Sequence, residues 1–501
     1  MIPDSSEIAI ENAEIISEAS KRRSATWDIG NAPRNYLSLV LSQAGSVFFA
    51  FASVWLITKV LGAEGYGGVF AIIAASQVAQ VLINWTAISV VRFGTEEFVE
   101  TEKIARAFWL RFFIFVPNVL IVLLAAKFWF PPLADWLKLS AETFWLVILH
   151  FSATALWVHV QMGFQAAKLP RMQGILLMFE RLLIFAGILL LIFYGKLTPF
   201  SALICYAVAP FLMITVGIFF LRRFIFARFS IDLQFVKKIA TYSLPLIPFA
   251  FIGYFSTGYV DAIFISKYLS TRDLGIYSVA VQISGIALQL PTLANSLLIP
   301  FFVTVLKENS TTKLNSYFKT VLPSLTLVWG ILCTLMAFAG AFLIPLIFGS
   351  KFAESVTPFW ILMTASIFAV PVACGYSALV HARSVTYIAA ITALLSAVVN
   401  ISLNFLLIPQ FGMEGCAWAT FITYFISVLA FVILLNRKTQ MSVSWIFIAF
   451  MPTFIGTLVY SYTENVWLGL AFSSMLAIFT VLLKRNSLRE SFGIMMRIIK
   501  K

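Results

Sequence analysis

The fold is decided by the stretch from Arg171 to Arg223, RMQGILLMFERLLIFAGILLLIFYGKLTPFSALICYAVAPFLMITVGIFFLRR. It holds two long apolar runs, 172–194 and 199–221, which are separated by a short polar turn and bounded by arginines. A helix rises about 1.5 Å per residue, so each run is long enough to cross about 30 Å of hydrocarbon. We therefore expect two membrane-spanning helices here.

Segments of the same kind fill most of the chain. We count about fourteen, with approximate spans of 36–58, 66–91, 107–130, 142–165, 172–194, 199–221, 242–266, 274–305, 320–348, 355–380, 385–408, 412–435, 443–460 and 465–483. The 501 residues are 61% hydrophobic and 11% charged, whereas soluble domains are about 45–50% apolar and about 25% charged. This composition excludes a soluble protein and predicts an all-α, multi-pass integral membrane protein.

The basic residues set the topology. Most of the 35 lysines and arginines fall in every second loop and near the two ends of the chain. Because positively charged loops stay in the cytoplasm, we expect both termini on the cytoplasmic side of the cell inner membrane. Topology thus explains the net charge of +13, and we expect no nucleic-acid partner.

A repeat with an offset of 208 residues relates the two halves of the chain. ITKVLGAEGYGGVFAI (57–72) matches ISKYLSTRDLGIYSVA (265–280), where Ile57, Lys59, Leu61 and Gly67 coincide with Ile265, Lys267, Leu269 and Gly275. LLLIFYG (189–195) resembles FLLIPQFG (405–412) at a similar offset. Chance similarity between apolar segments is the alternative. Two six-helix blocks of equal orientation imply two bundles related by a pseudo-twofold axis along the membrane normal, with a cavity between them.

These blocks divide the chain into five parts. They are a cytoplasmic N-terminal tail (1–34), an N-terminal six-helix bundle (35–230), a C-terminal six-helix bundle (231–436), two appended helices (437–484) and a basic cytoplasmic tail (485–501). In the first tail an acidic stretch precedes a basic cluster, the reverse of a secretory signal. We interpret this segment as solvated, with a short amphipathic helix as the alternative.

Three of the expected helices carry a stripe of neutral polar residues. The stripe residues are Gln77, Gln80 and Asn84 in the second helix, Gln282 and Gln289 in the eighth, and Asn400 and Asn404 in the eleventh. Such a stripe faces either a partner helix or water. Helix packing explains any single stripe, but stripes in both blocks favour a wet cavity. We therefore take these residues as substrate-cavity candidates.

Charged residues deep in the apolar segments are costly unless they are paired or solvated. Glu180 and Arg181 are adjacent, so they point about 100° apart and do not face each other. Each belongs either to an interhelical ion pair or to the cavity. Asp261 either pairs with Lys267 or Arg272, or serves ion coupling. Asp261 and Glu180 are our ion-coupling candidates.

Signals of catalysis or cofactor binding are missing from the sequence. The four cysteines lack metal-ligand spacing, and there is no Walker motif. His150 and His159 lie on opposite faces of one helix, which argues against a two-histidine site. His150, Thr154 and Gln161 share a face, and only that face is a lumen candidate. We expect no enzyme, no cofactor and no metal. Arg111 lies near a helix end, which is typical of a snorkelling anchor.

The stretch SAVVNISLNFLLIPQFGMEGCAWATFITY (396–424) resembles the polysaccharide exporters of the multidrug/oligosaccharidyl-lipid/polysaccharide superfamily. The matching positions are Asn400, Asn404, Leu407, Ile408, Pro409, Gly412, Gly415, Ala417, Ala419 and Thr420. A second match to these exporters comprises Pro245, Pro248, Asp261, Gly275, Tyr277 and Ser278. With the helix count, the similarity extends over residues 36–483.

This resemblance implies a flippase of the O-antigen (Wzx-like) type. Such a protein moves undecaprenyl-diphosphate-linked oligosaccharide across the membrane by alternating access, for O-antigen, capsule or exopolysaccharide synthesis. The implied partners are the lipid-linked glycan, membrane lipids and a polysaccharide polymerase or assembly protein, and we expect a monomer. Because arginine matches phosphate geometry, the candidates for binding the diphosphate are Arg34, Arg92, Arg181 and Arg383.

Three other functions fit parts of the pattern. An integral-membrane polysaccharide polymerase or ligase usually needs a large outer loop with charged catalytic groups, and the longest outer loop expected here, near Trp136, is short. A lipid II flippase has an arginine-rich first helix, and the first helix here holds no arginine after Arg34. A drug exporter of the sister branch typically has twelve helices and a more acidic cavity.

The charge distribution predicts the location of each loop. Reporter fusions after Arg223, Lys313 and Lys438 should report the cytoplasm, and fusions near Trp136 and Lys351 should report the outside. Paired phosphatase and fluorescent-protein fusions measure this directly. One inverted reporter in the middle of the chain would disprove the fourteen-helix assignment.

Overall fold

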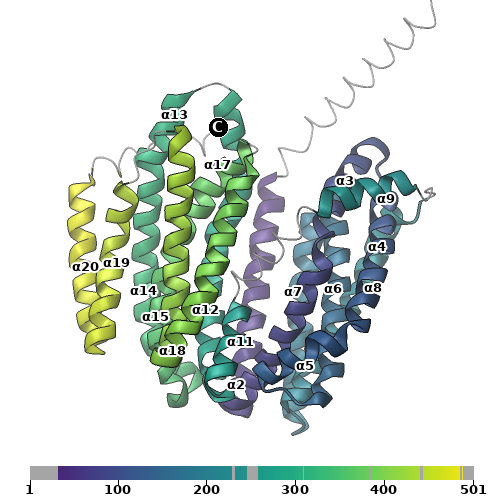
Figure 1. Ribbon diagram of the computed structural model, residues 1–501, viewed down its shortest axis with the longest axis horizontal. Helices are drawn as coiled ribbons and strands as arrows, with labels where there is room; N and C mark the ends of the chain where they lie inside the picture. The colour runs from purple at the N-terminus through teal and green to yellow at the C-terminus, as the bar shows by residue number, and fades with distance from the viewer. Residues whose placement is uncertain are drawn as a thin grey trace, which may run out of the picture.

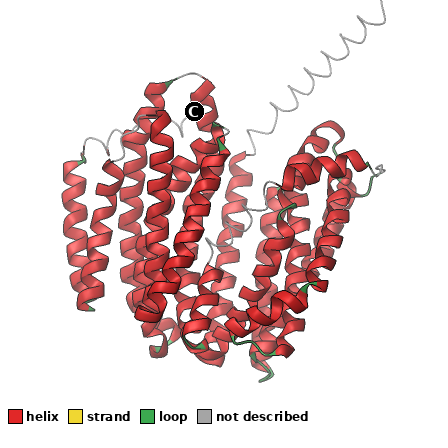
Figure 2. Ribbon diagram, in the orientation of Figure 1, coloured by secondary structure: helices red, strands yellow, loops and turns green. Residues whose placement is uncertain are grey.

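A computed structural model describes residues 32–227, 232–244, 258–307, 310–383, 385–439, 444–485 and 488. The described residues form helices and connecting loops without a strand (Figure 2). Nine of the described helices are long and apolar enough to cross a membrane. The expected tails at 1–31 and 489–501 lie outside the described residues.

Two of the helices are each too long for one crossing. Helix α2 (Ala32–Asn84) has 53 residues and α18 (Thr386–Thr439) has 54, which is about 80 Å at 1.5 Å per residue, against about 30 Å of hydrocarbon. Each is two helices joined at a kink, at Gly62 with φ 68° and at Gly412 with φ 59°. Only glycine adopts these left-handed angles freely, so each helix provides two spans.

The N-terminal bundle occupies the right-hand side of Figure 1. It comprises α2, α3 (Ala87–Thr101), α4 (Ala105–Leu124), α5 (Ala126–Leu137), η1 (Ala141–Thr143), α6 (Phe144–Ala166), α7 (Pro170–Phe193) and α8 (Pro199–Ile225). A short helix, α9 (Leu233–Ser243), follows α8 and packs beside α3 and α4. The α8 helix begins with a capping box, in which the Thr198 hydroxyl accepts the Ser201 backbone N–H.

The C-terminal bundle occupies the other side (Figure 1). Its elements are α11 (Gly258–Tyr268), α12 (Thr271–Lys307), α13 (Thr311–Ser316), η3 (Tyr317–Val321), α14 (Leu322–Phe348), η4 (Ser350–Ser355), α15 (Val356–Ala365), η5 (Ser366–Phe368), α16 (Ala369–Pro371), η6 (Val372–Tyr376), α17 (Ser377–Ala382) and α18. Helices α19 (Ser444–Thr463) and α20 (Val466–Leu483) pack on α14 at the outer edge. The structure thus confirms the predicted membrane architecture, although residues 245–257 of the seventh span lie outside the described residues.

The two bundles meet backbone to backbone at Gly67 and Gly275. A Cβ added to Gly67 would lie 2.0 Å from the Thr271 carbonyl oxygen, and one added to Gly275 would lie 1.8 Å from the Ala63 carbonyl oxygen. The 208-residue offset of the sequence repeat relates Gly67 to Gly275 and Ala63 to Thr271, so the two contacts are equivalent. Reciprocal contacts of this kind arise around a twofold axis, so the axis passes between these two glycines.

This contact generates a prediction about assembly of the bundles. Replacing Gly67 or Gly275 with valine places side-chain atoms against backbone that cannot rotate away, and such overpacking costs about 1–3 kcal/mol or more. We expect both variants to lose membrane abundance and thermal stability, measured by immunoblot and by fluorescence-detected gel filtration after heating. Gly285→Ala is the control, because nothing lies within 4 Å of an added Cβ there. Wild-type stability of Gly67→Val would disprove the close contact.

Candidate functional site

A polar cavity of about 390 Å³ lies between the bundles. It is lined by α2, α6, α7 and α8 of one bundle and by α11 and α12 of the other. The polar lining residues include Gln43, Ser46, Gln77, His150, Thr154, Glu180, Arg181, Tyr206, Tyr259 and Gln282. Of the stripe residues in α2, only Gln77 lines this cavity. His150 and Thr154 of α6 line this cavity, whereas Gln161 of the same predicted face does not.

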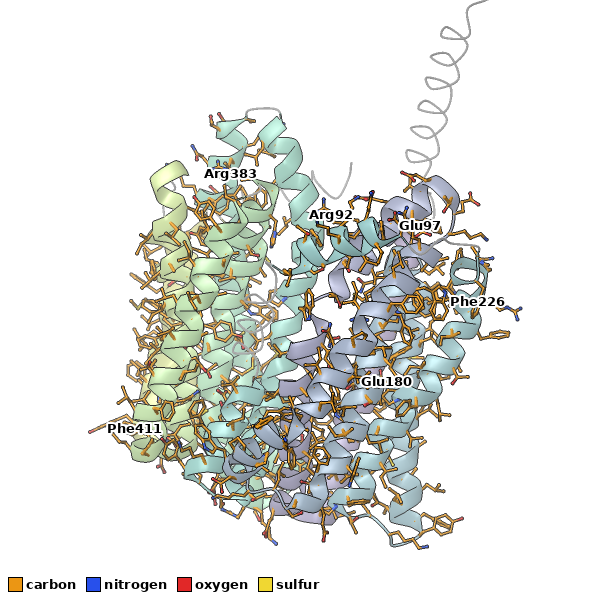
Figure 3. All side chains as sticks on the ribbon, turned by 45° about the vertical axis from the view of Figure 1, so that its right-hand side comes forward. Arg92, Glu97, Glu180, Phe226, Arg383 and Phe411 are labelled. Carbon is orange, nitrogen blue, oxygen red and sulfur yellow. The ribbon has the colours of Figure 1, made fainter. Side chains whose placement is uncertain are left out.

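Arg181 is the positively charged residue of this cavity. None of the ion pairs formed among the described residues includes it, which agrees with the predicted divergence of Glu180 and Arg181 on α7. The Glu180 carboxylate instead accepts a hydrogen bond of 2.7 Å from Trp157 Nε1 of α6. Figure 3 shows Glu180 deep within the bundle. Arg181 and Glu180 line the same cavity, and their opposite charges attract without forming an ion pair.

The other polar residues of α2 form a network inside the N-terminal bundle. Gln80 donates a hydrogen bond to Thr154 Oγ1, and Asn84 donates one of 3.3 Å to Gln80 Oε1. The Ser76 hydroxyl and His150 Nδ1 are 2.5 Å apart. Gln80 therefore joins α2 to α6, and Asn84 bonds to Gln80 along α2, which fits the helix-packing alternative for these two residues.

A second cavity, of about 500 Å³, lies in the C-terminal bundle. Asp261, Gln282, Ser396, Asn400 and Thr420 are among its polar lining residues. It shares Phe70, Tyr259, Gln282 and Gly285 with the first cavity. The rings of Phe70 on α2 and Tyr259 on α11 are stacked, with centroids 5.5 Å apart. This aromatic pair from both bundles separates the two cavities.

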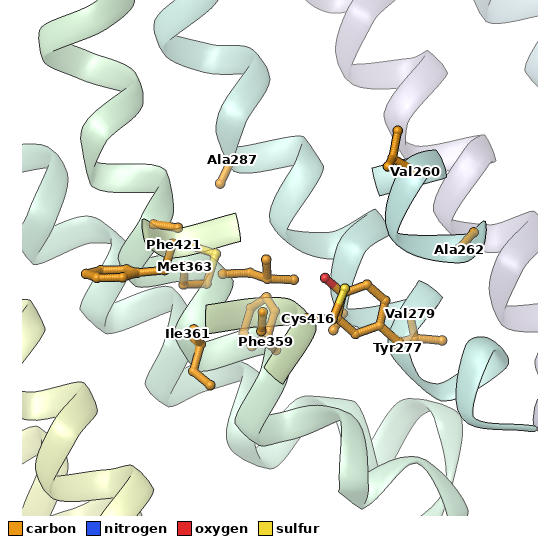
Figure 4. Close-up of a cluster of buried hydrophobic side chains, with 14 of the residues drawn as sticks. Val260, Ala262, Tyr277, Val279, Ala287, Phe359, Ile361, Met363, Cys416 and Phe421 are labelled. Atoms are coloured by element: carbon orange, nitrogen blue, oxygen red, sulfur yellow. The ribbon is translucent and has the colours of Figure 1, made fainter. Parts of the chain in front are cut away.

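Asp261 is held by hydrogen bonds from uncharged groups. Its carboxylate accepts from Tyr277 at 2.9 Å, from Thr420 at 3.3 Å and from Asn404 at 3.4 Å. Asn404 also donates to Asn400 Oδ1 at 3.1 Å. Figure 4 shows Tyr277 beside Cys416 in this packed region. The structure therefore brings together the polar residues of both sequence motifs.

The ion pairs considered for Asp261 do not form. Lys267 Nζ lies 3.6 Å from the centroid of the Trp136 ring, and Arg272 pairs with Glu354 at 2.8 Å. Pairing of Asp261 with Lys267 or Arg272 was therefore the wrong alternative. Asp261 and the oxygen atoms around it could hold a proton or a small cation. Within the described residues, no group of three or more His, Cys, Asp or Glu side chains could hold a metal ion.

Contacts between α5 and the C-terminal bundle close the molecule at the end near the kink in α2 (Figure 1). Trp136 and Lys138 belong to this α5 segment. Lys267 lies over Trp136, and Lys138 donates a hydrogen bond to the Leu269 carbonyl. Trp136 also packs near Phe405, at 6.3 Å between ring centroids. These contacts join α5 to the C-terminal bundle at the end of the molecule opposite Arg92 and Arg383 (Figures 1 and 3).

The remaining arginine candidates lie away from the two cavities. Figure 3 places Arg92 and Arg383 at the same end of the molecule, and neither lines a central cavity. The side chains of Arg34 and Gln289 lie outside the described residues. The structure thus brings Arg181 together with Gln77 and Gln282, but it does not bring Arg92 or Arg383 to them.

The interpretation of Arg111 as a snorkelling anchor is wrong. Its side chain is 0% exposed, its Nε donates to Thr86 Oγ1 at 3.1 Å, and it lies 4.9 Å from the Phe115 ring centroid. Thr86 stands in the short break between α2 and α3. The position of Arg111 along α4 indicated a nearby membrane surface. Its side chain, however, lies on the face of α4 that packs inside the bundle.

Sequence reasoning missed the aromatic members of the site. Phe70, Tyr206 and Tyr259 line the first cavity, but the chain holds 50 Phe and 15 Tyr, so these residues do not stand out. Tyr206 and Tyr259 line the same cavity as Arg181. A tyrosine at the level of a polar stripe is the signal that could have identified them.

The fold and cavities define a multi-pass membrane protein of the two-bundle transporter class. The sequence profile described as "Polysaccharide biosynthesis protein" matches residues 33–306. Since this match covers more than half of the chain, the protein belongs to that family. A comparison with curated protein sequences finds no match.

Solved structures show the same fold. The lipid II flippase MurJ in an inward closed conformation aligns with a TM-score of 0.67 and 15% identity, covering 89% of this chain and 99% of that one. An inward-facing multidrug resistance MATE family transporter of the MOP superfamily gives 0.58 and 14%, covering 79% and 96%. A mutant of the Vibrio cholerae MATE transporter VcmN gives 0.52 and 14%, covering 81% and 98%. At these identities the similarity concerns the fold.

The Asp261 network predicts how substitutions there affect stability. Asp261→Asn keeps the size of the side chain and an acceptor oxygen, so we expect near-normal membrane abundance. Asp261→Ala removes the acceptor of Tyr277 and Thr420 and one of the two acceptors of Asn404, at about 1–3 kcal/mol for each buried group left unpaired, so we expect low abundance and an earlier melting transition. Tyr277→Phe removes one donor and should have a small effect. Equal stability of Asp261→Ala and wild type would contradict this network.

Proposed function

We propose that the protein is a flippase that moves a polyprenyl-diphosphate-linked oligosaccharide across the cytoplasmic membrane for synthesis of a cell-surface polysaccharide such as O-antigen, capsule or exopolysaccharide. The observation that carries this proposal is the unpaired Arg181 in a polar cavity between two bundles. A permanent charge within a membrane requires a counter-ion or water. A diphosphate supplies the counter-charge, and a guanidinium binds it through two parallel hydrogen bonds.

The rest of the cavity suits a sugar headgroup. Gln77, Gln282 and Thr154 offer hydrogen-bond donors and acceptors to hydroxyl groups, and the aromatic rings of Tyr206 and Tyr259 offer apolar faces for sugar rings. The lipid tail has no place in a polar cavity of about 390 Å³ and stays in the bilayer. The lipid II flippase MurJ shares this fold, which supports the proposal of a flippase.

Alternating access follows from how the two bundles touch. The contact of Trp136 and Lys138 with the C-terminal bundle closes one end of the cavity, and the basic loops place this end outside the cell. In this conformation the substrate reaches Arg181 from the cytoplasmic side, on which both termini lie. Release requires the α5 contacts to open while the opposite end closes, with Gly67 and Gly275 as the fixed crossing.

Asp261 is the residue that couples transport to a proton or sodium gradient in this proposal. It lies in a cavity separate from that of Arg181, so cation and substrate anion do not compete for one site. Glu180 fits this role less well, because it lines the same cavity as Arg181. The Asp261→Asn variant, assembled in liposomes, should lose the dependence of transport on an imposed gradient while keeping its substrate affinity.

The central experiment concerns Arg181. We expect Arg181→Ala to leave membrane abundance near normal while abolishing surface polysaccharide in a complementation assay, and Arg181→Lys to retain part of the function, because a point charge replaces a bidentate fork incompletely. The matched control is Lys196→Gln, which removes an exposed charge at the closed end of the bundle. An immunoblot of the same membranes separates loss of function from loss of protein.

A structural role for Arg181 predicts a different pattern. Removal of one member of a buried pair leaves a lone charge and costs about 3–5 kcal/mol, so Arg181→Ala protein would disappear from the membrane. Rescue of both abundance and export by the double change Glu180→Gln plus Arg181→Gln would refute the binding role. Full export by Arg181→Ala would do so as well.

A further inference from the structure

A second basic site lies at the membrane-surface end of the N-terminal bundle, between α3 and α9. It is an open groove of about 480 Å³ lined by Arg92, Phe93, Gln234, Lys237, Lys238, Thr241 and Tyr242. It does not share a residue with either central cavity. We call it the α3/α9 groove. Three of its seven lining residues carry a positive charge, so its ligand is an anion.

The cations of the groove are held weakly by the protein itself. Glu96 is the acid beside them, and it lies 3.9 Å from Arg92 Nε and 3.8 Å from Lys238 Nζ. The side chains of Arg92, Lys238 and Glu96 are 54%, 59% and 54% exposed, so these pairs are worth little in water. Glu96 contacts two of the three cations, so an excess of two positive charges remains in the groove.

Two of these cations contact the faces of aromatic rings in the groove. The Arg92 guanidinium lies 4.6 Å from the Tyr242 ring centroid, and Lys238 Nζ lies 4.8 Å from that of Phe93. Phe93 and Tyr242 pack edge to face, with centroids 5.4 Å apart. The cation–π contacts hold the charged groups in position and leave their charges unneutralised. The groove therefore suits a compact, multiply charged anion.

The α9 helix is built to lie on a membrane surface. Its Ile239 is buried against Phe93 and Leu110, whereas Lys237 and Lys238 are exposed. Large apolar side chains project from both ends of the helix, with Leu233 79% exposed and Leu244 54% exposed. An amphipathic helix with exposed leucines and a basic face sits at the boundary between headgroups and acyl chains. The anion of the groove is therefore the headgroup of a lipid.

We propose that the α3/α9 groove binds the diphosphate of the polyprenyl carrier at the cytoplasmic leaflet, before the headgroup passes to Arg181. This inference rests on the proposed function. A diphosphate carries more charge in a smaller volume than a phosphodiester lipid, so it matches three converging cations better. Because the groove is open to the membrane surface, the carrier binds there with its tail still in the leaflet. The groove then raises the local concentration of substrate at the cavity mouth.

The test separates the two sites by using the Arg181→Ala protein in phosphatidylcholine nanodiscs. The probe is a fluorescent polyprenyl diphosphate. We expect Arg181→Ala protein to retain binding, and the added changes Lys237→Gln and Lys238→Gln to weaken it by about tenfold. The matched control adds Arg222→Gln and Arg223→Gln, which remove the same charge at the same end of the bundle but outside the groove, and should leave the affinity unchanged.

Each outcome has one meaning. Equal loss of affinity in the Arg222→Gln plus Arg223→Gln control would overturn the groove in favour of general surface charge. Complete displacement by phosphatidylglycerol at matched concentration would overturn its preference for a diphosphate, whereas inorganic diphosphate should compete. Loss of all binding in Arg181→Ala alone would overturn the groove and leave the central site standing. Failure of wild-type protein to bind the probe would overturn the proposed function instead.

Discussion

The reciprocal contact between Gly67 and Gly275 is the constraint on which the rest of the structure depends. Within lipid there is no hydrophobic drive to bring helices together, so close backbone packing at small residues decides where they cross. This crossing fixes α2 against α12 without an intervening side chain. Gln77 and Gln282 follow further along the same two helices and line the first cavity. The position of the cavity is thus set by two residues that have no side chain.

The sequence predicted the architecture because membrane crossing is a property of length and composition. Apolar runs, alternating basic loops and the 208-residue repeat led to the two bundles, and the repeat proved to contain the contact between them. The tenth span was not foreseen in detail. Between Ser350 and Ala382 it consists of consecutive α, 3-10 and π segments, with Pro358 and Pro371 within it. An apolar run carries no signal for such changes of helical pitch, because they depend on how the neighbouring helices pack.

Charged residues that line the two cavities could be picked out from the sequence because they are chemically out of place there. Arg181 and Asp261 stood out because an ionised group within an apolar segment needs an explanation. Arg111 stood out for the same reason, yet its direction was misjudged, because Thr86 becomes its partner only through the break between α2 and α3. Gln80 shares a stripe with Gln77 but bonds to Thr154. Helical periodicity identifies a face, and tertiary packing decides which part of that face meets water.

The separation of opposite charges between the bundles bears on how the two halves communicate. Arg181 and Asp261 line different cavities, and the stacked rings of Phe70 and Tyr259 stand between them. Tyr259 and Asp261 belong to the same helix, α11, two residues apart. In the proposed mechanism, a movement of α11 on cation binding at Asp261 would carry Tyr259 with it and change the wall of the Arg181 cavity. Two ligands of opposite charge can in this way influence each other through one rigid helix, without direct contact between them.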